Sequence, residues 1–123
     1  MKKIFFLFLI IILLAGCTKK EQNHYLKIKG QNIKIELADN EQKRKYGLSG
    51  KNNLCDNCGM LFVFDKKDFR SFWMKDMKFS IDIIWINDDK IVQIIKNAKL
   101  PKGKNIPTYN SDKKINYVLE VNA

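Results

Sequence analysis

Histidine is almost absent from this sequence, and that absence excludes one large class of enzymes. The only histidine, His24, stands in a polar stretch near the N-terminus. A nucleophile activated by a histidine base therefore cannot be assembled inside a folded domain. No phosphate-binding loop or metal-ligand set is present either. The sequence favours a non-enzymatic role over catalysis and indicates no cofactor.

The sequence also has no apolar run long enough to cross a membrane as a helix, which takes about 20 residues. Its one apolar run, Ile4 to Leu14, is shorter and follows the positive pair Lys2-Lys3. Such a run is typical of a signal peptide. Small residues and then Cys17 follow, in the order Leu-Ala-Gly-Cys of a lipobox. We therefore predict a lipoprotein signal peptide at residues 1–16 and a lipid on Cys17.

Lipidation of Cys17 predicts a tethered domain rather than a free one. Two acyl chains hold a protein stably at a membrane, whereas one gives only marginal binding. Residues 17–24 are then the lipidated cysteine and a polar linker. We expect the protein in the cell envelope, at the periplasmic face of the outer membrane. In a cell with one membrane it would lie on the outer face of the cytoplasmic membrane.

Arginine is scarce although the chain is strongly basic. The formal net charge is +10, yet only Arg44 and Arg70 are arginines, and lysines are spread along the chain. A basic chain raises the possibility of a nucleic-acid partner. The export signal excludes that partner, so the partners expected are the membrane and a cell-envelope polymer, glycan or protein.

Short alternating segments predict a mainly β domain from residue 25 to residue 123. Residues 25–29 and 33–37 read as two strands around a Gly-Gln-Asn turn. Asp39 or Asn40 can cap one short helix that runs through Tyr46 and ends at Gly47. Further strands are expected at 59–64, 69–74, 81–86, 91–95 and 115–121, with a long lysine-rich loop at 96–114. About seven strands with tight turns predict a compact small β-sandwich or partly open barrel.

An ordered series of motifs resembles a known family. The segments are Gly47-Leu48, Leu54, Gly59-Met60-Leu61-Phe62, Phe72-Trp73-Met74-Lys75, Ile81-Asp82-Ile83 and Tyr117-Val118-Leu119-Glu120. Together they resemble the DUF192 family, a domain of unknown function, over about residues 33–123. The resemblance implies a compact, mainly β fold that is often exported or lipid-anchored, and it brings no established reaction. The family pattern continues with another strand beyond the point where this sequence stops at Ala123, which favours a truncated domain.

Two carboxylates on predicted strands are candidate pocket residues. Asp82 interrupts an apolar strand, and Glu120 alternates with the expected core residues of the last strand. A buried, unpaired charge is costly and often marks a site. Trp73, beside Lys75, stands on the opposite face from its aromatic neighbour. We predict a small aromatic and acidic ligand pocket at Trp73, Lys75, Asp82 and Glu120, with a structural role for the carboxylates as the alternative.

The two remaining cysteines predict a disulfide. Cys55 and Cys58 form an even pair in an exported chain. Two alternatives remain: a copper or thiol-redox protein, whose soft ligands would be these cysteines with His24 and the methionines at 60, 74 and 77, and a hydrolase that uses Asp82 and Glu120. The interpretation favoured by the sequence is a tethered, non-catalytic binding or accessory domain.

Overall fold

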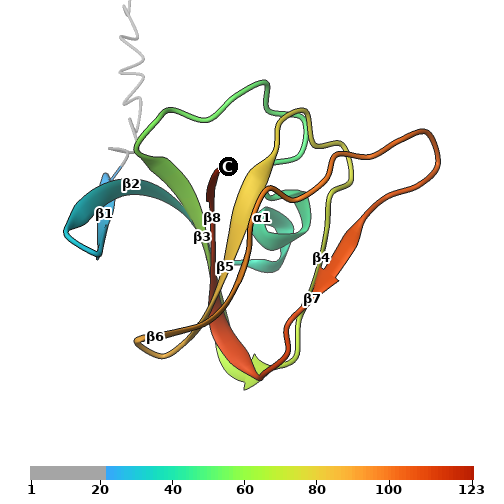
Figure 1. Cartoon of the computed structure of the whole chain (residues 1–123). Coiled ribbons are helices and arrows are strands. Elements are labelled where there is room, and N and C mark those ends of the chain that lie inside the picture. Colours follow the sequence, from blue (N-terminus) through green and yellow to red (C-terminus); the bar gives the residue numbers. More distant parts are fainter. Residues whose placement is uncertain (1–21) are drawn as a thin grey trace, which may run out of the picture.

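A computed structural model describes residues 22–123 of the chain. The predicted signal peptide, Cys17 and the first part of the linker lie outside these described residues. One large sheet, a small second sheet and a short helix make up the described part (Figure 1). The prediction of a mainly β domain with one short helix is confirmed. Its eight strands are one more than expected, and the large sheet curls without closing into a barrel.

The large sheet has six strands in the order β1-β2-β3-β8-β5-β6. Neighbouring strands are antiparallel except β2 and β3, which run parallel and are joined through the helix and the cysteine loop. The strands span His24–Ile28 (β1), Gln31–Ala38 (β2), Cys58–Asp68 (β3), Ile81–Asn87 (β5), Lys90–Ile95 (β6) and Ile115–Asn122 (β8). The first strand begins at His24, the last residue of the predicted linker.

The second sheet pairs β4 (Ser71–Trp73) with β7 (Thr108–Asn110). Both strands come from segments with weak sequence signals. β4 is shorter than the strand predicted at 69–74, and β7 lies inside the region predicted to be a loop at 96–114. Three paired residues on each strand stabilise little by themselves, so packing against the large sheet decides that they form.

The helix α1 (Glu41–Tyr46) follows the predicted local signals. The Asn40 side chain accepts a hydrogen bond from the Lys43 backbone N–H, which caps the first turn. Gly47 ends the helix with a positive φ of 51°, a conformation that suits glycine. Basic residues fill the last turn, where they complement the helix dipole.

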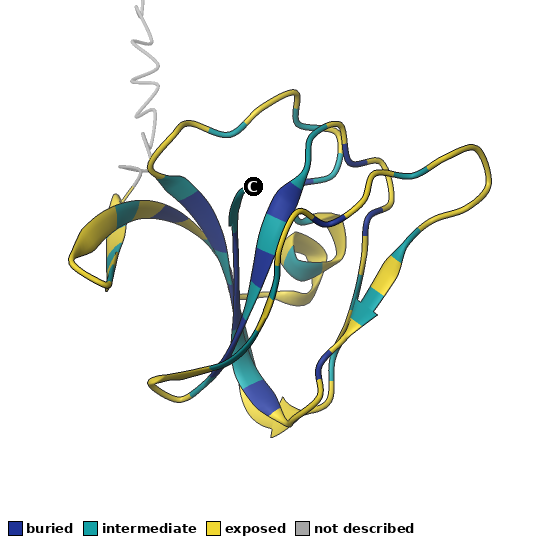
Figure 2. Ribbon diagram, in the orientation of Figure 1, coloured by how far each residue is buried: buried dark blue, intermediate teal, exposed yellow. Residues whose placement is uncertain are grey.

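The core has two parts, one on each face of the large sheet. Burial is greatest on the middle strands β3, β8 and β5, whereas α1 is largely exposed (Figure 2). The larger part lies between the sheet and β4, β7 and their loops, around Trp85, Phe62 and Met74. The smaller part, around Leu119, is covered by the curled β1–β2 hairpin. Because β8 is covered on both faces, Val118 and Glu120 are buried as well as Leu119, unlike the one-sided alternation expected from sequence.

Candidate functional site

A pocket of about 590 Å³ opens on the side of the sheet that carries the larger core. It lies between α1, the turn after it, the inner face of β3, and β4 with the turn before it. This volume is within the range of small-molecule sites. Aromatic and basic side chains dominate its lining: Phe62, Phe64, Phe69, Phe72, Trp73, Arg44, Lys45 and Arg70, with Glu41, Glu120 and Thr108 among the other polar residues.

Glu120 is the buried polar group of this pocket. It lies on β8 between Met60 of β3 and Ile83 of β5, and only 6% of its surface is exposed. Gly59, next to Met60, allows β3 to approach here, because a Cβ at that position would lie 2.9 Å from the Glu120 carbonyl oxygen. The sheet thus places a carboxyl group among apolar neighbours.

The Glu120 carboxyl group has no compensating partner within residues 22–123. None of the side-chain hydrogen bonds or ion pairs of the described residues involves it. Burial alone raises its pKa to about 8, from an ordinary value of 4.5. The group is therefore mostly protonated at neutral pH, and it can donate a hydrogen bond as well as accept one.

Two arginines surround one aromatic ring in the pocket wall. The guanidinium carbon of Arg70 lies 4.2 Å from the centroid of the Phe64 ring, and that of Arg44 lies 5.4 Å from it. Arg44 also donates a hydrogen bond to the Val63 carbonyl oxygen at 2.9 Å, which fixes its position over β3. Cation–π contacts of this kind orient the guanidinium groups without neutralising them.

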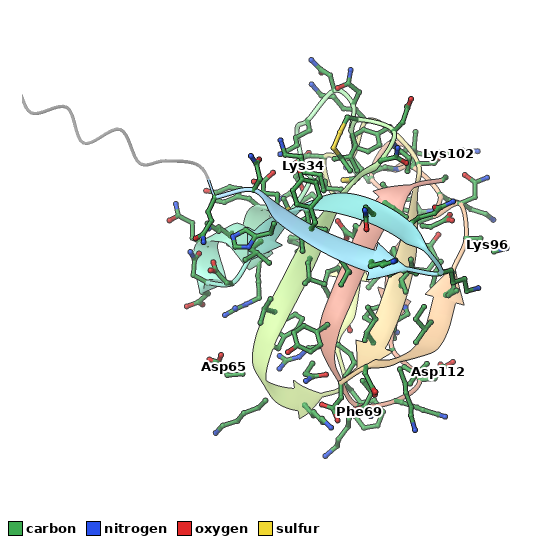
Figure 3. The ribbon with its side chains drawn as sticks, turned by 90° about the vertical axis from the view of Figure 1, so that its left-hand side faces the viewer. Lys34, Asp65, Phe69, Lys96, Lys102 and Asp112 are labelled. Carbon is green, nitrogen blue, oxygen red and sulfur yellow. A yellow bond between two sulfur atoms is a disulfide. The ribbon has the colours of Figure 1, made fainter. Side chains whose placement is uncertain are left out.

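Exposed aromatic side chains stand at the mouth of the pocket. Phe69 and Trp73 keep 57% and 51% of their surface exposed. Phe69 lies at the end of the molecule away from Lys34 (Figure 3). Behind them, Phe72 packs edge-on against Phe62 and Trp85, so the ring that faces the core is fixed. The mouth offers flat apolar surface on a rigid base.

The structure places two of the four predicted pocket residues, Trp73 and Glu120, in the lining. Lys75 lies outside the lining but next to Trp73, with its Nζ 5.2 Å from the centroid of the Trp73 ring. Asp82 lies on the opposite face of the sheet, where its Oδ1 accepts a hydrogen bond from the Asn97 backbone N–H at 2.8 Å. The two carboxylates therefore do not converge on one site.

Sequence reasoning missed the two arginines as pocket residues. Arg44 follows the helix cap, and Arg70 lies in the turn between β3 and β4. Their scarcity in a lysine-rich chain was the available signal, since guanidinium groups suit aromatic and planar anionic partners better than ammonium groups do. Their placement beside Phe64 depends on contacts between residues far apart in the chain.

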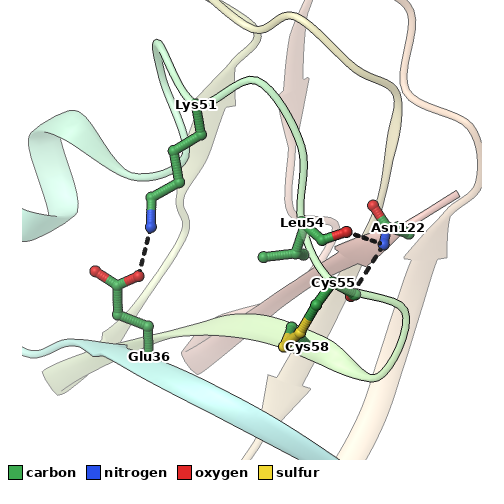
Figure 4. The surroundings of a disulfide bond; sticks show 6 residues. All are labelled: Glu36, Lys51, Leu54, Cys55, Cys58 and Asn122. Atoms are coloured by element: carbon green, nitrogen blue, oxygen red, sulfur yellow. Dashed lines mark hydrogen bonds and ion pairs between the residues drawn. A yellow bond between two sulfur atoms is a disulfide. The ribbon is translucent and has the colours of Figure 1, made fainter. Parts of the chain in front are cut away.

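Cys55 and Cys58 form a disulfide at the entrance to β3, as predicted (Figure 4). The Asn122 side-chain amide donates to the carbonyl oxygens of Leu54 and Cys55, at 2.9 and 3.2 Å. These bonds attach the cysteine loop to the end of β8. The disulfide therefore supports the loop that connects α1 to β3, outside the aromatic pocket.

The soft ligands considered from sequence are divided between two places. Met60, Met74 and Met77 are buried in the larger core, and both cysteines are in the disulfide. Among the described residues there is no group of three or more His, Cys, Asp or Glu side chains that could hold a metal ion.

Within residues 22–123, no helix has the length and apolar character needed to cross a membrane.

The fold and the pocket define a small, mainly β domain with an aromatic pocket over a buried carboxyl group. The chain belongs to the DUF192 family, described as uncharacterized ACR, whose family model matches residues 24–123. A second model, the prokaryotic membrane lipoprotein lipid attachment site, matches residues 1–18, where Cys17 is the only cysteine. The predicted resemblance is confirmed, and the chain is a lipoprotein of the cell envelope.

Two solved structures resemble this one. A candidate transcription regulator from Sinorhizobium meliloti 1021 is 31% identical, with a TM-score of 0.68 over 76% of this chain and 70% of that chain. A protein of unknown function from Novosphingobium aromaticivorans DSM 12444 is 27% identical, with a TM-score of 0.68 over 75% of this chain and 64% of that chain. Among curated proteins, none matches.

Proposed function

We infer that this lipoprotein is a tethered, non-catalytic binding domain and that its ligand is a small molecule held in the aromatic pocket. The anchor on Cys17 would hold the domain at a membrane surface, facing the periplasm or, in a cell with one membrane, the exterior. A pocket of about 590 Å³ with an aromatic lining suits a ligand the size of one or two rings.

The single observation that carries this proposal is the unpartnered carboxyl group of Glu120. No protein group within residues 22–123 pairs with this carboxyl group, yet its oxygens are not among the fully enclosed polar atoms of these residues. They therefore reach the pocket, where a ligand atom can supply the missing partner. Being mostly protonated at neutral pH, Glu120 would donate to a carbonyl, ether or hydroxyl oxygen of the ligand.

The aromatic side chains support the same interpretation. Trp73 and Phe69 are exposed at the pocket mouth, where a ring of the ligand could stack on them. Lys75 lies at the pocket edge, with its Nζ 5.2 Å from the centroid of the Trp73 ring. Exposed aromatics beside a buried polar group are the usual composition of a small-ligand site.

The hydrolase and thiol-redox alternatives gain less support. A hydrolase would need two carboxylates at one site, whereas Asp82 and Glu120 face opposite sides of the sheet. A thiol-redox centre is favoured at a helix N-terminus, whereas Cys58 begins the strand β3.

The test uses the full-length lipidated protein, purified in detergent. Native mass spectrometry detects any small molecule that co-purifies, and ligand-observed NMR measures binding of a library of one- and two-ring compounds. Glu120→Met removes the hydrogen-bonding group and keeps the side-chain volume similar. Asp82→Asn is the matched control, since it alters a carboxylate on the other face of the sheet.

We expect binding to fall about tenfold or more in Glu120→Met and to stay unchanged in Asp82→Asn, because only Glu120 faces the pocket. A folded wild-type protein that binds no library member and carries no co-purified molecule would contradict a binding function. So would compounds whose binding is unaffected by Glu120→Met.

A further inference from the structure

The two arginines of the pocket wall have no acidic partner in the described part of the chain. All three ion pairs of residues 22–123 are formed by lysines, at Lys43, Lys51 and Lys67. Arg44 and Arg70 are both half-buried, and both line the pocket. Partly buried cations without a carboxylate are unusual, because withdrawal from water weakens hydration without a compensating attraction.

The hydrogen bonds that these guanidinium groups do make leave much of their donor capacity free. Arg44 donates through one terminal nitrogen to the Val63 carbonyl oxygen, and Arg70 donates through one to the Lys66 carbonyl oxygen at 3.0 Å. The Nε of Arg70 is buried and has no partner within residues 22–123. A ligand in the pocket cannot reach that enclosed nitrogen. Because a guanidinium group carries five N–H donors, each arginine still retains terminal N–H donors for another partner.

The remaining titratable groups leave the pocket positive. Lys45 adds a further cation to the lining, and Glu41, on the exposed side of α1, is the only acidic residue there besides Glu120. The carboxyl group of Glu120 stays mostly uncharged there because its pKa is raised to about 8. A cleft with an excess of one charge attracts ligands of the opposite sign.

We propose that the ligand of this pocket is a ring-bearing organic acid whose carboxylate is held at the wall formed by Arg44, Phe64 and Arg70. Its ring lies toward Phe69 and Trp73 at the mouth, and an uncharged oxygen of the same molecule meets Glu120. The inference rests on the proposed binding function and adds the charge of the ligand to it. Planar carboxylates suit guanidinium groups because two parallel N–H···O bonds can form.

Matched pairs of compounds test this charge directly. Methyl β-D-glucuronide and methyl β-D-glucoside share a sugar ring and differ in a carboxylate. Phenylacetate and phenylacetamide make the same comparison for an aromatic ring. The two pairs together distinguish a sugar acid from an aromatic acid as the ligand. Dissociation constants are measured by ligand-observed NMR on the full-length lipidated protein at low and high salt.

We expect at least one acid to bind about tenfold or more tightly than its neutral counterpart, because charge-assisted hydrogen bonds are the stronger kind. That preference should shrink in high salt. Arg70→Gln and Arg44→Gln should each weaken binding of the acid and leave binding of the neutral compound nearly unchanged. Lys96→Gln, which removes one exposed charge away from the pocket, is the control.

Because Arg70 also packs on Phe64, its replacement by Gln could weaken binding by destabilising the fold. Arg70→Lys tests for this effect. It retains the charge, so partial binding with an unchanged melting temperature separates recognition from folding. Neutral compounds that bind as tightly as the acids would overturn the inference and leave the binding function intact. If none of the four compounds binds while a library member or a co-purified molecule does, the inference fails and the binding function stands.

Discussion

Asp82 and Glu120 lie one register step apart on neighbouring strands and point to opposite faces of the same sheet. Asp82 is paired with Val121, and Glu120 is paired with Ile83. Since successive side chains alternate across a sheet, this offset of one residue sends the two carboxylates to different environments. Asp82 finds a backbone N–H partner near the surface, whereas Glu120 is buried beside the aromatic pocket.

The raised pKa of Glu120 predicts a stability that falls with rising pH. Between about pH 4.5, where an unfolded glutamate ionises, and about pH 8, the folded state binds more protons than the unfolded state. The free energy of unfolding then decreases by up to about 1.4 kcal/mol per pH unit in this window. Urea denaturation at several pH values measures it.

Glu120→Gln should remove most of that slope, because a neutral amide has no proton to lose. Glu41→Gln, a change of an exposed glutamate near the same pocket, should keep it. Asp39 and Asp88 do not interfere, since lysine partners lower their pKa values and their effects fall below this window. An unaltered slope in Glu120→Gln would show that Glu120 ionises normally in the folded protein.

Phe72→Ala and Trp73→Ala, at adjacent positions of β4, should have opposite consequences. Phe72 is half-buried and packs edge-on against Phe62 and Trp85, with centroids 4.8 and 5.3 Å away, so its removal should cost about 2 kcal/mol of unfolding free energy. Trp73 is 51% exposed, so its removal should change stability little and weaken ligand binding. Thermal melts with binding titrations separate the two effects, and equal destabilisation by both changes would contradict this assignment.

Asp82→Ala should behave as a structural change. It leaves the Asn97 backbone N–H without its acceptor and should lower the free energy of unfolding by about 1 kcal/mol. Binding should not change, because Asp82 faces away from the pocket. Loss of binding at unchanged stability would instead support the sequence prediction that Asp82 is a ligand-binding residue.

Reduction of the Cys55–Cys58 disulfide should destabilise the domain modestly. The bridge closes a very short loop, for which the chain-entropy model gives about 2 kcal/mol. Thiol titration of the unfolded protein should find the two cysteines only after reduction, and ligand binding should persist because the bridge lies outside the aromatic pocket. Free thiols without reduction would contradict the disulfide.

The sequence by itself determined the features that depend on local pattern. The charged start, apolar run and small residues before Cys17 identified a lipoprotein. Gly47 marked the end of α1 and narrowed its start to Asp39 or Asn40, of which Asn40 is the cap, and alternation located most strands, because capping and two-residue periodicity are local properties. The paired cysteines likewise indicated the disulfide.

Only the tertiary structure decided which of these residues form a site. Strand order places β8 in the middle of the sheet, so Glu120 is buried, and the register sends Asp82 to the other face. Arg44 and Arg70 meet around Phe64 because the helix, β3 and the turn before β4 pack together. Such contacts join residues far apart in the chain, and local sequence patterns do not encode which strand becomes whose neighbour.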